Sequence, residues 1–106
     1  MPIPSSAFSV RLADFLILPD ADAILAVRRT VFVEEQAVPE SLERDGLDET
    51  CQHVLAFDTS NRAIGTARLM PHGRIGRVAV LADWRKRGVG AALMRTLLAE
   101  ADRRGF

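Results

Sequence analysis

The chain has 106 residues, and 14 acidic and 14 basic side chains leave a formal net charge of zero. That length suits one small domain, and zero net charge argues against the broad basic surface that nucleic-acid binding requires. Cys51, the single cysteine, cannot form an intramolecular disulfide, which fits a reducing compartment. The sequence has neither a run of ~20 apolar residues nor a basic and apolar leader, so we expect a cytoplasmic protein with no membrane partner.

A strand and a helix are the first elements predicted in chain order. Residues 1–6 are expected to be a loose end, and alternating apolar and polar residues predict a strand over residues 8–12. Asp20 or Asp22 can cap the free N–H groups of a helix that follows. Apolar residues at helical spacing then predict that helix over residues 22–34.

Three strands are predicted next, after an acidic loop. Residues 36–50 are rich in acids and contain proline and glycine, so we expect a loop with one helical turn at residues 41–44. The strands that follow are separated by turn residues and are predicted over residues 52–57, 63–70 and 74–80. Because they are close in sequence, an antiparallel meander is the economical arrangement.

The last and clearest element is a helix over residues 88–104, with apolar side chains on one face and charged side chains on the other. The order strand, helix, three strands, helix predicts a mixed α/β or α+β fold.

Most of the chemical information lies between the last strand and this helix. Gly88 and Gly90 leave backbone N–H groups open to a ligand. The first turn of a helix adds unpaired donors and a partial positive charge. Arg85, Lys86 and Arg87 bring full charges to the same place, so the expected ligand is a diphosphate.

Two common phosphate loops do not match this segment. A Walker loop has Lys-Ser or Lys-Thr after its glycines, and neither pair occurs here. A dinucleotide-binding fingerprint has a third glycine at the position where Leu93 stands.

The pattern that does match is Arg/Gln-x-x-Gly-x-Gly/Ala, present as Arg-Lys-Arg-Gly-Val-Gly at residues 85–90. It resembles the coenzyme A signature of the GNAT family of N-acetyltransferases. Further segments resemble small bacterial members of that family, in the same order along the chain: Val31–Pro39, Glu43-x-Asp45-x-x-Asp48, His53, Ile64–Leu69 and Ile75–Val80. The resemblance covers residues 22–105.

This resemblance implies a GNAT-like mixed sheet, acetyl-CoA as co-substrate and no metal. Residues 75–104 would bind coenzyme A, with the backbone of Val78, Ala79 and Val80 pairing with the pantetheine arm. The cofactor loop would hold the pyrophosphate and is defined here by seven residues: Arg85, Lys86, Arg87, Gly88, Val89, Gly90 and Ala91. An amine, whose identity the sequence leaves open, would attack the thioester directly, and a backbone N–H near Val80 would stabilise the oxyanion.

Two candidates for the general base are Glu35, acting through a water, and His53. Each has a structural alternative: a solvated carboxylate at a helix end, or a packed, hydrogen-bonded histidine. The acidic loop either attracts a cationic amine or is only solvated; its acids are Glu40, Glu43, Asp45, Asp48 and Glu49. Arg68 and Arg77 are expected to pair with this loop.

Residues 1–106 are expected to form a single partial domain, incomplete at its C-terminal end. Family members continue with strands and a helix that build the other wall of the cofactor slot, often with a tyrosine that protonates the thiolate; this chain has no tyrosine. The strand over residues 74–80 would then expose an edge, which predicts a homodimer or a strand-exchanged oligomer. The alternative is a non-catalytic coenzyme A-binding or interaction module that needs a partner chain to complete the fold.

Overall fold

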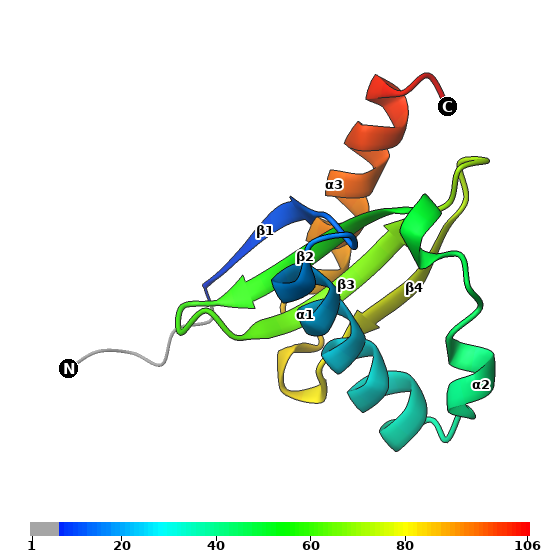
Figure 1. The fold of residues 1–106 in the computed structure, drawn as a ribbon. Helices are drawn as coiled ribbons and strands as arrows, with labels where there is room; N and C mark the ends of the chain where they lie inside the picture. Colours follow the sequence, from blue (N-terminus) through cyan, green and yellow to red (C-terminus); the bar gives the residue numbers. More distant parts are fainter. Residues whose placement is uncertain (1–6) are drawn as a thin grey trace.

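A computed structural model of the chain describes residues 7–106, and the loose end expected over residues 1–6 lies outside that range. The elements are β1 (Phe8–Ala13), α1 (Leu18–Arg28), the π-helix η1 (Arg29–Glu35), α2 (Glu40–Glu43), the short 3-10 helix η2 (Asp48–Thr50), β2 (Gln52–Asp58), β3 (Ala63–Leu69), β4 (Ile75–Val80), the 3-10 helix η3 (Ala82–Trp84) and α3 (Val89–Arg103). This order confirms the predicted mixed α/β layout (Figure 1).

The four strands form one sheet in the order β1-β2-β3-β4. Each neighbouring pair is antiparallel, which confirms the meander of β2, β3 and β4. Within residues 7–106 the sheet contains antiparallel pairs only. β4 lies at one edge of the sheet, as expected, and β1 lies at the other.

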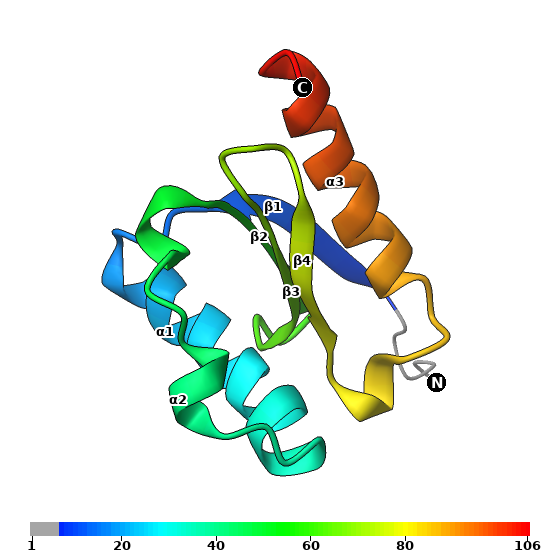
Figure 2. The ribbon, with the colours of Figure 1, turned by 90° about the vertical axis from the view of Figure 1, so that its right-hand side faces the viewer.

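Helices cover both faces of the sheet. Figure 2 shows α3 on one side and α1 with α2 on the other. The two central strands are therefore buried on both faces: Val54, Leu55 and Ala56 of β2 and Ile64 of β3 all have 0% exposure. Burying a valine, leucine or isoleucine side chain stabilises the fold by about 1.5–3 kcal/mol. No helix within residues 7–106 combines the length and the apolar character that crossing a membrane requires.

The first helix begins earlier than predicted and then changes type. α1 starts at Leu18 rather than near residue 22, because Pro19 is tolerated in the first helical turn. Asp20 is not a cap: its carboxylate accepts bonds of 2.7 and 3.0 Å from Arg11. After α1 the chain continues as η1, a rare helix type that is frequent at functional sites and that here ends at Glu35.

A buried arginine fastens the acidic loop to α1. Arg28 has a side-chain exposure of 1%, and its Nη2 lies 2.6 Å from Oε2 of Glu43. Its Nη1 lies 2.6 Å from Oδ1 of Asp48, a carboxylate that is itself 1% exposed. Neither alternative for the acidic loop is right for these two acids, because they are enclosed and paired rather than solvated or free to attract an amine.

Two further arginines tie the same loop to the sheet. Arg68 on β3 reaches Oδ1 of Asp48 at 2.9 Å and also pairs with Asp45. Arg77 on β4 lies 3.3 Å from Oε2 of Glu43. The predicted pairing of Arg68 and Arg77 with the acidic loop is thus confirmed, and its role is structural.

Candidate functional site

The candidate site lies at the end of β4, where the chain continues through η3 and the cofactor loop into α3. Gly88 has a φ of 86°, in the left-handed region, and directly precedes the fifteen-residue helix α3. Lys86 is also left-handed, with a φ of 63°. A Cβ built on Gly90 would lie 3.9 Å from Cγ2 of Val80, so the first turn of α3 lies close to the end of β4. The strand and the helix start therefore meet at one place.

The cofactor loop is anchored at one end and exposed in the middle. Residues 85–88 are exposed, whereas Val89 is 1% exposed. Trp84, the only tryptophan, is 8% exposed and stacks edge-on against Phe8 at 6.3 Å. The guanidinium of Arg87 lies 5.3 Å above the Trp84 ring. This anchor was not predicted, although a lone tryptophan beside the basic triplet is a visible signal in the sequence.

Val80 presents its backbone to the open edge of the sheet. The N–H of Leu81 donates to the carbonyl of Ile64 on β3 at 2.9 Å. Because ladder bonds alternate along an antiparallel strand, the N–H and C=O of the preceding residue, Val80, point away from β3. This is the side on which the pantetheine arm was expected to pair.

A bulge bends β4 upstream of that point. The register between β3 and β4 shifts between Thr66 and Arg68, and Arg77 opposite them has a left-handed φ of 49°. Such strain in a non-glycine residue needs surrounding support, and the Arg77 side chain finds it in two bonds to the carbonyl of Glu43, at 3.2 and 3.3 Å.

Glu35 is brought to the cofactor loop by an ion pair. Its two carboxylate oxygens each lie 2.7 Å from a terminal nitrogen of Arg85. The Nε of Arg85 also donates to the carbonyl of Val80 at 3.0 Å. Hydrogen bonding to Arg85 holds the pKa of Glu35 below its ordinary value of 4.5, so the group is a carboxylate near neutral pH.

His53 does not reach this site. In the sheet register it pairs with Arg68, which in turn pairs with Gly76 at the far end of β4 from Val80. Its ring is 1% exposed, bonds through Nε2 to the carbonyl of Asp48 at 2.8 Å and stacks on Phe15 at 5.1 Å. This geometry supports the packed, hydrogen-bonded interpretation over a role as base.

Enclosure of His53 makes stability depend on pH. Burial lowers its pKa below the ordinary 6.5, so the unfolded chain takes up a proton at a higher pH than the folded protein. Stability is therefore expected to fall as the pH drops from about 6.5 toward the folded pKa. Urea unfolding between about pH 7 and about pH 5 measures this slope.

Two glutamine variants isolate the effect. His53→Gln should flatten the slope, whereas His72→Gln, at the exposed second histidine, should retain it. An unchanged slope in His53→Gln would contradict the assignment.

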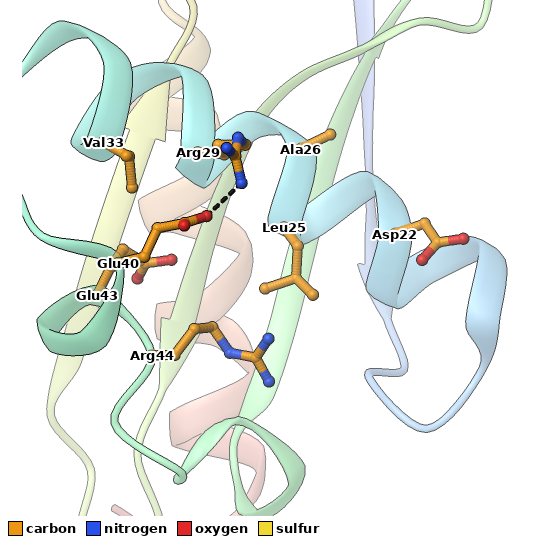
Figure 3. Close-up of a pocket in the computed structure, with 8 residues that line it drawn as sticks. All are labelled: Asp22, Leu25, Ala26, Arg29, Val33, Glu40, Glu43 and Arg44. Atoms are coloured by element: carbon orange, nitrogen blue, oxygen red, sulfur yellow. Dashed lines mark hydrogen bonds and ion pairs between the residues drawn. The ribbon is translucent and has the colours of Figure 1, made fainter.

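Two of the pockets lie beside η1 and α2. One, of about 290 Å³, lies between α1, η1 and α2 and is crossed by the Arg29–Glu40 ion pair (Figure 3). The other, of about 390 Å³, adjoins β4 and has a mostly apolar lining: Phe32, Val38, Leu42, Glu43, Gly76, Arg77 and Val78. Only the second shares residues with β4, so it is the pocket relevant to the candidate site.

Known proteins place this geometry in a family. The family model described as "Acetyltransferase (GNAT) family" matches residues 19–106. The uncharacterized protein YyaT of Bacillus subtilis (strain 168) is 38% identical over 84 residues, which are 74% of this chain and 56% of YyaT. The chain thus spans little more than half the length of that relative.

Solved structures agree in fold. An acyl-CoA N-acyltransferase from Pseudomonas aeruginosa superposes with a TM-score of 0.81 at 28% identity, covering 93% of this chain and 72% of that one. Escherichia coli ElaA gives a TM-score of 0.80 at 26% identity, with coverage of 93% and 72%.

Proposed function

Because the chain belongs to the acetyltransferase (GNAT) family, we propose that it binds acetyl-CoA and takes part in moving the acetyl group to an amine. One observation carries the proposal. An exposed basic loop with a left-handed Gly88 starts a long helix at the point where the edge strand β4 turns its backbone outward. Backbone donors, helix charge and basic side chains at one place suit a pyrophosphate.

The cofactor is proposed to lie along the end of β4. Residues 85–91 would hold the pyrophosphate, and the backbone of Val78, Ala79 and Val80 would pair with the pantetheine arm, while the side chain of Ala79, at 2% exposure, packs inward. Bound acetyl-CoA supplies an activated thioester. The chain's own part is to hold that group so that the N–H of Val80 faces the oxygen on which negative charge develops.

Transfer is proposed to be direct. The lone pair of a neutral amine forms a bond to the acetyl carbon, the carbon–sulfur bond breaks, and its electron pair leaves with the thiolate. The proton lost by the amine passes through a water to Glu35. The apolar pocket beside β4 is where we expect the acceptor to enter, because it adjoins Val78 and lies on the same side as η1.

A second candidate function follows from the open edge of β4. In residues 7–106 that strand pairs only with β3, and an exposed edge favours pairing with another chain. The chain would then be a coenzyme A-binding or interaction module, completed by a second copy or by exchanged strands. This candidate expects acetyl-CoA binding without turnover, so an acetyl-transfer assay separates it from the first.

Reversing one charge in the cofactor loop tests the acetyl-CoA site. Arg87→Glu is expected to weaken acetyl-CoA binding about 10-fold or more, since a hydrogen bond to a charged group contributes ~1.5–3 kcal/mol. Isothermal titration calorimetry measures the affinity. Arg95→Glu makes the same change at an exposed position further along α3 and should bind nearly as well as the unsubstituted protein. Equal affinities for all three proteins would remove the acetyl-CoA assignment.

A further inference from the structure

We propose that Arg85 is a positioning residue, whose side chain holds the Glu35 carboxylate at the end of β4 rather than binding the phosphates of acetyl-CoA. The inference rests on the proposed function. Arg85 would then differ in role from Lys86 and Arg87, the other two residues of the basic triplet.

Every nitrogen of the Arg85 guanidinium donates a hydrogen bond within the protein. Its two terminal nitrogens each donate to one oxygen of Glu35, both at 2.7 Å, and its Nε donates to the carbonyl of Val80 at 3.0 Å. All three nitrogens are therefore engaged, in the fork geometry that arginine forms with a carboxylate. The pair joins residues 50 positions apart in the chain and so links η1 to the end of β4.

Charge at this point also disfavours a phosphate. Glu35 compensates the charge of Arg85 and would repel an anion placed between them. Lys86 and Arg87 are exposed, and Arg87 stacks on the Trp84 ring. These two residues are left to supply the basic charge of the cofactor loop.

The same contacts fix where Glu35 can act. Arg85 binds Glu35 and the outward-facing carbonyl of Val80 with one rigid group, so the carboxylate is held beside the strand end where the thioester is proposed to lie. A general base needs this placement before its basicity matters. Arg85 does not itself accept a proton; it keeps Glu35 within reach of the attacking amine and its bridging water.

Lysine and glutamine variants distinguish positioning from phosphate binding. Arg85→Lys keeps the positive charge but cannot bind both carboxylate oxygens and the Val80 carbonyl together. A phosphate contact would survive this change, whereas positioning would not. We expect acetyl-CoA affinity within about 3-fold of the unsubstituted protein and a kcat lowered about 10-fold or more, with the most reactive member of a panel of primary amines as acceptor.

Removing Glu35 tests the coupling. Glu35→Gln should lower kcat by about 100-fold, the usual lower limit for a lost general base. The double variant Glu35→Gln/Arg85→Gln should have the same kcat as Glu35→Gln, because Arg85 acts only through Glu35. Acetyl-CoA affinity of Glu35→Gln, measured by calorimetry, should stay unchanged, because Arg85 is not a phosphate ligand held back by Glu35. Arg87→Gln is the matched control: it removes the same charge from the same loop and should weaken binding with little effect on kcat.

Calorimetry shows whether Arg85 binds the phosphates of acetyl-CoA even when no acceptor amine is known. The inference is overturned if Arg85→Gln weakens acetyl-CoA binding as much as Arg87→Gln, if Glu35→Gln tightens it, or if the losses of kcat multiply in the double variant. Failure of the unsubstituted protein to bind acetyl-CoA would instead overturn the proposed function, and that result comes from a separate titration. Unchanged melting temperatures show that each variant is folded.

Discussion

Replacing Arg28 with methionine is expected to destabilise the fold by about 3–5 kcal/mol, the usual loss when one partner of a buried ion pair is removed. Arg28 is 1% exposed and contacts Glu43 and Asp48, which are 5% and 1% exposed. Methionine fills much of the same space but leaves two enclosed carboxylates without their shared partner. Unfolding in urea, followed by circular dichroism, measures the loss.

The neighbouring arginine provides a matched control. Arg29 lies next in the chain and also forms an ion pair, with Glu40, but both side chains are 59% exposed. Because exposed pairs contribute about 0–1 kcal/mol, Arg29→Met should change the free energy of unfolding little. If Arg28→Met costs no more than this control, the buried pairs do not hold the acidic loop in place.

Neutralising the carboxylates should restore part of the loss. In Arg28→Met/Glu43→Gln/Asp48→Asn the two enclosed carboxylate charges are removed together with Arg28, so this variant is expected to be more stable than Arg28→Met alone. Arg68 also contacts Asp48 at 2.9 Å, which makes the recovery partial. This order of stabilities separates loss of charge pairing from loss of packing.

The elements with a strong local signal were predictable from the sequence. The three strands of the meander and α3 appear within one or two residues of their predicted bounds, because apolar periodicity and turn residues act over a few neighbouring positions. The cofactor loop was found in the same way, from glycines and basic residues directly before a helix. These features depend on what lies next to them in the chain.

Apart from the pairing of Arg68 and Arg77 with the acidic loop, the contacts between distant residues were not predictable. The sequence left the acidic loop either solvated or attracting a cationic amine, and neither alternative included its burial against Arg28, which lies 15 residues from Glu43 and 20 from Asp48. The pairing of Glu35 with Arg85 spans 50 residues, and nothing near either residue signals it. The change from α1 to a π-helix likewise has no local pattern that we could identify, since its residues keep a helical apolar spacing.

Gly65 on β3 links the packing of the sheet to the geometry of the cofactor loop. A Cβ added there would lie 3.0 Å from Cγ1 of Val89, 3.1 Å from Cδ1 of Leu93 and 3.3 Å from the carbonyl oxygen of Ala79. Val89 is the first residue of α3 and follows Gly88 directly. The missing side chain at Gly65 is therefore what lets the start of α3 approach the sheet.

Gly65→Val should accordingly disturb stability and acetyl-CoA binding together. Overpacking a well-filled core costs about 1–3 kcal/mol, and the strain is relieved most simply by moving the start of α3 outward, because β3 is held by strands on both sides. That movement carries the backbone donors of the cofactor loop away from β4, so acetyl-CoA affinity should fall about 10-fold.

Gly76→Ala on β4 is the matched control, since an added Cβ there meets no heavy atom within 4 Å in the described residues. Calorimetry and urea unfolding on both variants test whether the two losses occur together; a Gly65→Val protein that is destabilised but binds acetyl-CoA normally would show that the loop does not depend on how α3 packs against the sheet.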